Sequence, residues 1–257
     1  MKAKTLLRVN KKLKNSFLSF QNIKLNPLDK TCYDKSNSLE NKLFFSELYN
    51  IVTKNSLENK FLIVFEEDQK NSEIKSKDYL KKLSIVEKQK SKIISNLKFE
   101  KILFIDSYKK IGFDVKKKKN LLYLVTDHIN LTGFNPLIGK NDSTIGDRFP
   151  DMSEAYNKVI NNNLKGIFQK FDKISVSYGI GIAIDTQYYS EYIENENYEI
   201  KSSYLKDVYA DFIITELIFK VITSLHSKMR VNAICLNDND NNNILNEKMF
   251  HDVLQLL

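Results

Sequence analysis

The residues with the clearest chemical potential lie in one stretch, residues 124–156. It contains an adjacent Asp127 and His128, and carboxylate and imidazole are the side chains of general acid–base catalysis. Neighbouring residues at the end of a strand point to opposite faces, so a structural role is the stronger interpretation of this pair. The histidines His128, His226 and His251 are not spaced as zinc ligands and accompany no cysteine pair, so we expect no metal site.

The same stretch predicts a rigid loop that leads into a helix. Gly133 and Pro136 are turn residues within the loop. Asp151 is expected to cap the following helix, and Glu154 three residues later completes a capping-box pattern.

Apolar runs of strand length, separated by segments of helix length, must position this stretch. This alternation predicts a single α/β domain with a central mixed β-sheet flanked by helices. In such sheets ligands bind in the loops after the carboxyl ends of strands. The expected strands are Phe61–Phe65, Ile102–Ile105, Leu121–Thr126, Ile174–Ile184 and Arg230–Leu236, and the expected helices are Tyr79–Leu97, Met152–Phe171, Leu217–Ser227 and Glu247–Leu257.

The charge of the chain is concentrated at one end. The 257 residues carry a formal net charge of +8, but residues 1–28 contain seven bases and no acid, which leaves 33 bases against 32 acids elsewhere. We therefore expect residues 1–40 to form a basic, flexible arm and residues 41–257 to form the folded domain. Such an arm could touch RNA or a membrane surface or direct the protein to an organelle, but the lysine-rich composition throughout favours a solvated tail.

Composition favours a cytoplasmic protein with neither a membrane span nor a nucleic-acid partner. No apolar run approaches the roughly 18–20 residues that cross a bilayer. Lysines interrupt every apolar run between Met1 and Phe20, so we expect no secretory signal there. Cys32 and Cys235 cannot form a disulfide framework, which suits a reducing compartment.

Residues 124–156 read LVTDHINLTGFNPLIGKNDSTIGDRFPDMSEAY. This run resembles the trimeric, low-molecular-mass purine nucleoside phosphorylase family over Asp127–Gly133, Asn135–Gly139, Gly146 and Arg148–Tyr156. A fainter resemblance continues through Ala210–Ile213, Val221–Ile222, His226 and Arg230–Val231. It implies a nucleoside-phosphorylase-like fold and a homotrimer. It also implies the family reaction, in which a purine nucleoside and inorganic phosphate, the co-substrate, give a purine base and ribose 1-phosphate without a cofactor.

The resemblance also implies positions for substrate and for the subunit contact. Asn239 falls on a purine-contacting Asn of the family, and Gln187 falls on its purine-binding Glu. Phe134 would offer an aromatic face to a neighbouring subunit's site. The ribose-contacting His has two possible counterparts by spacing, His251 and Glu247. The expected residues of the subunit interface are His128, Asn130, Asn135 and Pro136.

The phosphate half of the site departs from the family pattern. All seven glycines lie at position 112 or later, so the family's N-terminal glycine-rich phosphate loop is missing. Its phosphate-binding Arg is replaced by the acidic run Glu66, Glu67 and Asp68, and Glu216 adds a carboxylate near the expected phosphate and ribose. Carboxylates repel phosphate, although Lys109 and Lys110 could form a substitute anion site.

We therefore assign no catalytic residue from the sequence. Two functional hypotheses remain open. One is an enzyme of purine salvage whose activity is reduced or lost. The other is a non-catalytic structural or regulatory homologue that keeps the fold and the subunit interface.

Overall fold

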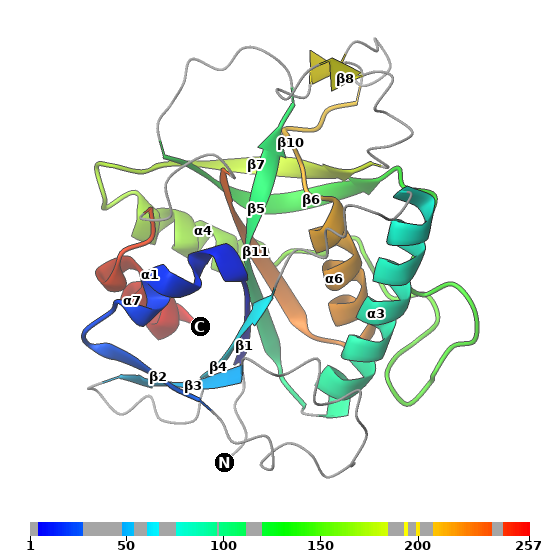
Figure 1. The fold of residues 1–257 in the computed structure, drawn as a ribbon, viewed down its shortest axis with the longest axis horizontal. Coiled ribbons are helices and arrows are strands. Elements are labelled where there is room, and N and C mark those ends of the chain that lie inside the picture. The colour runs from blue at the N-terminus through cyan, green and yellow to red at the C-terminus, as the bar shows by residue number, and fades with distance from the viewer. Residues whose placement is uncertain are drawn as a thin grey trace.

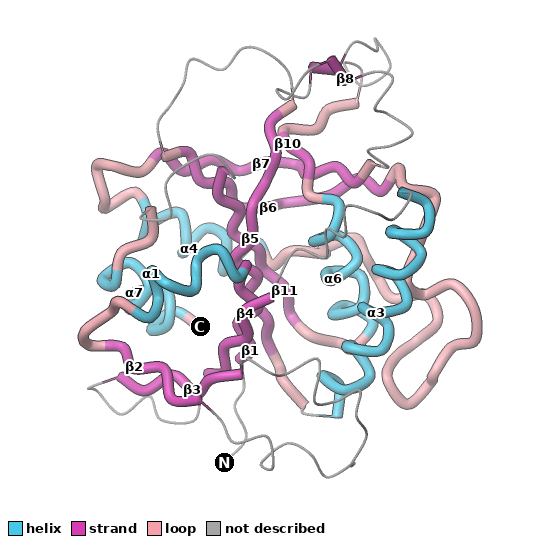
Figure 2. Tube along the Cα trace, in the orientation of Figure 1, coloured by secondary structure: helices cyan, strands magenta, loops and turns pink. Residues whose placement is uncertain are grey.

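A mixed β-sheet runs through the molecule between two groups of helices (Figure 1). The computed structural model describes residues 5–27, 48–53, 61–66, 76–96, 98–111, 120–184, 193–194, 199–200, 208–237 and 244–257. Within these residues the main sheet has nine strands in the order β10-β7-β6-β11-β5-β1-β4-β3-β2, and β8 and β9 form a separate pair. Helices α1, α4 and α7 lie on one side of the sheet, and α3 and α6 lie on the other (Figure 2).

The strands are β1 (Thr5–Asn10), β2 (Ile23–Pro27), β3 (Leu48–Thr53), β4 (Phe61–Glu66), β5 (Lys101–Lys110), β6 (Leu121–Asn130), β7 (Ser175–Ala183), β8 (Ile193–Glu194), β9 (Glu199–Ile200), β10 (Phe212–Ile213) and β11 (Arg230–Asn237). The helices are α1 (Lys14–Leu18), preceded by a 3-10 turn (Lys11–Leu13), then α3 (Ser76–Asn96), α4 (Lys158–Phe168), α6 (Thr215–His226) and α7 (Glu247–Leu256).

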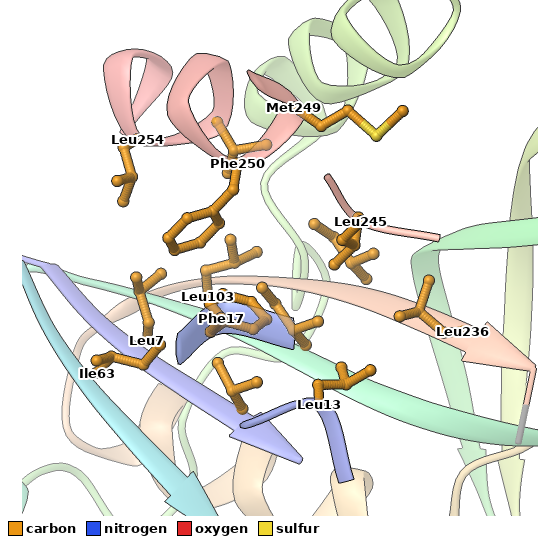
Figure 3. Packing of buried hydrophobic residues seen from close by; sticks show 14 of the residues in the cluster. Leu7, Leu13, Phe17, Ile63, Leu103, Leu236, Leu245, Met249, Phe250 and Leu254 are labelled. Atoms are coloured by element: carbon orange, nitrogen blue, oxygen red, sulfur yellow. The ribbon is translucent and has the colours of Figure 1, made fainter. Parts of the chain in front are cut away.

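Alternation along the strands sends side chains into two separate cores. On β1, Leu7 and Val9 belong to the cluster that α1, α4 and α7 cover, whereas Leu6 belongs to the cluster beneath α3 and α6. Figure 3 shows the first cluster, in which Phe17 of α1 meets Phe250 of α7 edge to face, with ring centroids 4.6 Å apart. The even-numbered side chains of β1 therefore face α3 and α6.

The strands β5, β11, β6, β7 and β10 close on themselves, because β10 pairs with both β7 and the end of β5. Glycine is required at two positions of β7 for β10 to approach. A Cβ on Gly179 would lie 2.6 Å from the Phe212 ring, and one on Gly181 would lie 2.1 Å from Ile214. The Asp211 carboxylate accepts a hydrogen bond from the Ile180 amide at 2.7 Å and strengthens this closure.

The five expected strands and the four expected helices are all present. One helix begins later than expected, at Lys158, where the Asn157 side chain accepts a hydrogen bond from the Ile160 amide. The expected capping box is wrong, because Asp151 instead accepts bonds from the amide and hydroxyl of Ser153 in a local turn. A carboxylate followed by Ser two residues later can satisfy itself without starting a helix.

The expected flexible arm is wrong for residues 5–27. Strand β1 lies near the middle of the sheet, pairs in parallel with β4 and β5, and is buried along its whole length. The flanking basic residues gave the segment the composition of a tail, but Leu6, Leu7 and Val9 are core residues. The folded domain therefore begins before the expected boundary at residue 40.

The place of β1 in the core gives a direct test. We expect Leu7→Ala to lower the free energy of unfolding by about 2–5 kcal/mol, because Leu7 is fully buried and the substitution leaves a cavity. The matched control is Leu18→Ala at a side chain that is 49% exposed, which should cost much less. Urea unfolding at pH 7 measures both, and equal small losses would contradict a structured N-terminal strand.

Candidate functional site

Buried charged side chains gather at the carboxyl ends of the parallel strands, on the face covered by α3 and α6. Parallel pairing sets Asn10 at the end of β1 opposite Glu66 at the end of β4. On the other side, Val9 pairs with Ile105, so Asp106 of β5 follows directly beside Asn10. This is the edge at which α/β sheets bind ligands.

Arg8 is the centre of this group. Its Nε and Nη2 atoms donate to Glu66 Oε1 at 3.0 and 2.7 Å. The same Nη2 also reaches Glu87 Oε2 of α3 at 2.9 Å. The side chains of Arg8 and Glu87 are 2% and 1% exposed, so water contributes little to their solvation and the ion pairs replace it.

Two lysines extend the group from the helices. Lys90 of α3 donates to Glu66 Oε1 at 3.2 Å and to Glu87 Oε1 at 3.1 Å. Lys220 of α6 donates to Asp106 Oδ2 at 3.1 Å and lies 3.4 Å from Glu66 Oε2. We call the six residues the ion cluster: Arg8, Glu66, Glu87, Lys90, Asp106 and Lys220.

The ion cluster is electrically balanced, with three cations against three carboxylates. Burial alone would raise the pKa of Glu66, but the three cations outweigh it and hold that pKa well below its usual value. The pKa of Asp106 is lowered in the same way, because Lys220 and the Asn10 amide overcome the effect of burial. The pKa of Lys220 is raised despite its burial, chiefly by Asp106 and Glu66. Glu66, Asp106 and Lys220 therefore remain charged at neutral pH.

The carboxylates that the sequence placed at the anion site have a different role from the one expected. We expected Glu66 to present an open negative charge, but Glu66 is committed to internal ion pairs. Asp106 is paired in the same way. Glu216 lies in the first turn of α6, where its field helps to raise the pKa of Lys220. Glu67 and Asp68 lie outside the described residues.

The sequence does not indicate the cations of the ion cluster, because no motif joins them. Arg8 and Glu87 are 79 positions apart, and Lys220 is 114 positions from Asp106. A local signal did exist for two of them. Arg8 interrupts the buried run Leu6–Val9, and Lys220 interrupts the buried run Leu217–Ile222. A charge at a core position requires a partner, but the sequence does not name that partner.

The stretch 124–156 begins at a bulge in β6, between Val125 and Asp127. Asn161 of α4 donates to the Val125 carbonyl at 2.9 Å, and Asn232 of β11 donates to Asn161 at 2.7 Å. These amides supply hydrogen bonds where the regular ladder is interrupted and attach α4 to the sheet.

The geometry of Asp127 and His128 agrees with a structural role for the pair. Asp127 Oδ1 accepts from the His128 amide at 2.7 Å, whereas the His128 ring contacts the Tyr156 hydroxyl at 3.2 Å. Burial lowers the pKa of His128, which Asp127 opposes, and burial raises the pKa of Tyr156 well above its usual value. Both groups are therefore neutral at pH 7.

The loop after β6 is held by its own side chains and by the helices beneath it. Asn130 Oδ1 accepts from the Thr132 hydroxyl at 2.6 Å, and its amide donates to the Phe134 carbonyl at 2.8 Å. Gly146 approaches the α6 end so closely that a Cβ there would lie 1.7 Å from the His226 carbonyl oxygen. This close approach explains why glycine is needed at that position.

The candidate substrate residues are not all brought together. Phe134, expected to face a neighbouring subunit, packs against Leu80, Leu83 and Phe219 of its own chain. His251 lies on α7, on the opposite side of the sheet from α3 and α6. Glu247, its alternative, accepts bonds from the Gln21 and Asn22 amides and joins α7 to the N-terminal segment. Asn239 and Gln187 lie outside the described residues.

The expected interface residues lie in or beside one loop. Asn135 is exposed, Pro136 is buried, and His128 and Asn130 are half-buried at the end of β6. Lys109 and Lys110, the substitute anion site considered from the sequence, lie at the end of β5, where that strand pairs with β10.

An open cavity of about 470 Å³ lies at the opposite edge of the sheet, before β5 and β11. Lys98 and Lys228 line it at the ends of α3 and α6 in left-handed backbone conformations. Its lining residue Glu100 directly precedes β5, whereas Asp106 of the ion cluster lies toward the other end of that strand, so we do not assign the chemistry to this cavity. Among the described side chains no group of three or more His, Cys, Asp or Glu residues could hold a metal ion. None of the helices in the described part of the chain is long and apolar enough to cross a membrane.

Together, the mixed sheet, the flanking helices and the polar carboxyl edge define a single-domain α/β protein with a nucleoside-phosphorylase-like fold. A purine nucleoside phosphorylase of Schistosoma mansoni complexed with a monocyclic inhibitor superposes with a TM-score of 0.64 at 15% identity, covering 99% of this chain and 90% of that one. The schistosomal enzyme in complex with hypoxanthine gives a TM-score of 0.61 at 16% identity, covering 99% of this chain and 84% of that one.

Sequence comparison agrees with the structural likeness. Purine nucleoside phosphorylase 1 of Bacillus subtilis (strain 168) is 32% identical over 143 residues, which are 55% of this chain and 49% of the relative. The Geobacillus stearothermophilus protein of the same name is 33% identical over 131 residues, 51% of this chain and 45% of the relative. The aligned region thus spans about half the length of these curated relatives, and no protein-family model matches the chain. The chain is thus similar to purine nucleoside phosphorylases in sequence over about half of its length and in fold over almost all of it.

The lowered carboxylate pKa values predict acid sensitivity centred on Glu66. A carboxylate whose folded pKa lies below its unfolded value of about 4.3 stabilises the fold above that pH and loses this contribution as pH falls through the folded pKa. We expect Glu66→Gln to lower the free energy of unfolding by about 3–5 kcal/mol at pH 7, because it leaves buried cations under-neutralised. The deficit relative to the wild type should shrink below about pH 4.

Denaturant unfolding between pH 3 and pH 7 measures this dependence. The matched control is Glu154→Gln, which removes the same charge from a side chain that is 73% exposed and should have little effect at any pH. A deficit for Glu66→Gln that stays constant across this range would mean that the ion cluster does not control acid stability.

Proposed function

We propose that the protein is a divergent member of the purine nucleoside phosphorylase family that recognises purine nucleosides or bases, and that its capacity for phosphorolysis is strongly reduced or lost. The family reaction joins a purine nucleoside and phosphate to give a purine base and ribose 1-phosphate, a step of purine salvage. One observation carries the proposal: the cations at the ligand-binding edge are already neutralised by the protein's own carboxylates.

Phosphorolysis needs a cradle for a phosphate that is mostly dianionic at neutral pH. Such cradles are built from backbone N–H groups, usually in glycine-rich loops, or from free cationic side chains. This chain has no glycine before Gly112, and Arg8, Lys90 and Lys220 are paired with carboxylates of the ion cluster. Losing one preorganised stabilising group commonly costs about 10²–10³ in rate. A phosphate entering among three buried carboxylates would meet a larger obstacle.

Purine recognition has separate support. The schistosomal neighbours were solved in complex with hypoxanthine and with adenosine, and this chain shares their fold. Asn239 and Gln187 are the residues that we assign to the purine, because an amide can both donate to and accept from a purine edge. A Gln where the family has a Glu keeps the shape but lacks the charge that would hold a base N–H most strongly. Purine binding can therefore persist where phosphorolysis is lost.

The alternative is a non-catalytic structural or regulatory homologue, and the distribution of family-like residues favours it over an efficient enzyme. The best-matched stretch, residues 124–156, comprises the end of β6 and the loop after it, whereas the edge expected to bind phosphate carries internal ion pairs. That loop leaves large apolar side chains in solvent, with Ile138 68% and Phe149 85% exposed. Exposed apolar groups of this size mark contact surfaces.

We therefore also propose that the chain forms a homotrimer through this loop and the residues beside it, His128, Asn130, Asn135 and Pro136. The free, buried Cys235 is consistent with the cytoplasmic location that we propose.

A phosphate-dependent assay with inosine and guanosine tests the catalytic part of the proposal. Release of hypoxanthine or guanine should be far slower than the roughly 1–10³ s⁻¹ typical of enzymes, with the Bacillus subtilis relative as positive control. Calorimetry with hypoxanthine tests the binding part, and Asn239→Ala should weaken binding while Asn242→Ala, three positions later in the sequence, should not. Ordinary turnover would overturn the reduced activity, and absence of hypoxanthine binding would favour the purely structural alternative.

Sedimentation equilibrium at micromolar concentration tests the proposed assembly. The chain has a mass of 30.0 kDa, so a trimer gives a measured molecular mass three times that of the chain. We expect Phe149→Ser to shift the population toward monomer, because a large apolar side chain is lost from the contact. Tyr209→Ser is the control, since Tyr209 is 89% exposed but lies outside the loop. A wild-type chain that sediments only as a monomer would rule the assembly out.

A further inference from the structure

We propose that Arg8, Lys90 and Lys220 form a receptor for a small carboxylate anion, and that the Glu66 side chain is the anion that permanently occupies it. This inference deepens the proposed function. It rests on that function only in treating the carboxyl edge of the sheet as a ligand site. The receptor itself is argued from the contacts of the ion cluster.

Three cations from three different elements converge on one carboxylate. Arg8 comes from β1, Lys90 from α3 and Lys220 from α6, with contacts to the Glu66 oxygens of 2.7, 3.2 and 3.4 Å. A carboxylate that serves only to neutralise Arg8 needs no further cation, and Glu87 already provides a second carboxylate for that purpose. Convergence of this kind is the arrangement by which proteins hold a bound anion.

Glu66 fills the receptor incompletely. Its Oε1 atom accepts from both Arg8 and Lys90, whereas the buried Oε2 atom has no hydrogen-bond donor among the described groups and meets only the charge of Lys220, at 3.4 Å. A buried acceptor without a donor is costly. An anion that is not tethered to the end of β4 could turn both oxygens toward the donors.

The other carboxylates keep the receptor in place when Glu66 is removed. Glu87 still holds Arg8 and Lys90, and Asp106 still holds Lys220. Without Glu66 the remaining five groups carry one net positive charge, and Glu216 lowers the local potential further near Lys220. This balance suits a monoanion better than a mostly dianionic phosphate, so the chemical class is a small carboxylate such as formate or acetate.

Tethering explains why the wild-type site should not exchange its anion. A side chain attached to the same fold has a high effective concentration, which a dissolved carboxylate has to exceed. Protonation does not release Glu66 near neutral pH, because the surrounding cations hold its pKa well below the usual value despite its burial. Among the described residues, the charged groups that act on Glu66 are the three cations and Glu87.

The test is chemical rescue of Glu66→Ala, which removes the carboxylate and leaves space for a replacement. Thermal unfolding is followed at pH 7.5 with acetate, formate or phosphate, against sodium chloride at the same ionic strength. We expect acetate at ten times its Kd to raise the midpoint of the variant by roughly 3–6 °C, with a smaller shift for phosphate. Glu66→Gln should show no such shift, because its amide fills the same space.

The wild type and Glu154→Ala, an exposed charge removal, control for general salt effects. Equal responses of Glu66→Ala, Glu66→Gln and Glu154→Ala to acetate would overturn the proposal, as would no response of Glu66→Ala. If Glu66→Ala is unfolded without added anion, far-UV circular dichroism reports whether acetate restores a cooperative fold, and failure to restore it overturns the proposal as well. No nucleoside enters the measurement, so ordinary inosine turnover would sink the proposed function and leave this result unchanged.

Discussion

A guanidinium group in the middle of a buried strand has to be neutralised, and the rest of the sheet edge is arranged to do this. Arg8 lies on β1 between the two flanking parallel strands and meets Glu66 from one of them and Glu87 from the covering helix α3. These contacts fix the distance of α3 from the sheet and the register of β1 against β4. Once Glu66 is held there, Lys220 is drawn to the same edge from α6.

The ion cluster and the closed ring of strands depend on one another. Long β5 supplies Asp106 to the cluster and then continues to pair with β10, which completes the ring. Tyr108, on the same face two positions after Asp106, packs against Tyr123 and Phe212 inside the closure, with ring centroids 5.1 and 5.3 Å away. One strand therefore passes from the charged edge into an aromatic core, and a shift of its register would disturb both.

The loop after β6 and the strand ends beside it differ in how closely they resemble purine nucleoside phosphorylases. The loop after β6 resembles purine nucleoside phosphorylases in sequence and is held by Asn130 and by the close approach of Gly146 to α6. The neighbouring strand ends have instead become a balanced set of internal ion pairs. A site built to receive an anion has to carry uncompensated positive potential, and the described residues here compensate theirs within the chain.

The sequence by itself determined the fold class, the five central strands and the resemblance to purine nucleoside phosphorylases, because hydrophobic periodicity and a long irregular motif are local signals. It also indicated acidic residues at the expected anion site. It could not reveal that Glu66 is neutralised, because the partners lie 58 positions away at Arg8 and across two helices. Nor did it place strand β1 in the core, because the basic residues around that short strand gave the segment the composition of a solvated tail. Pairing between distant charges is decided by strand order and helix placement, which only the tertiary structure supplies.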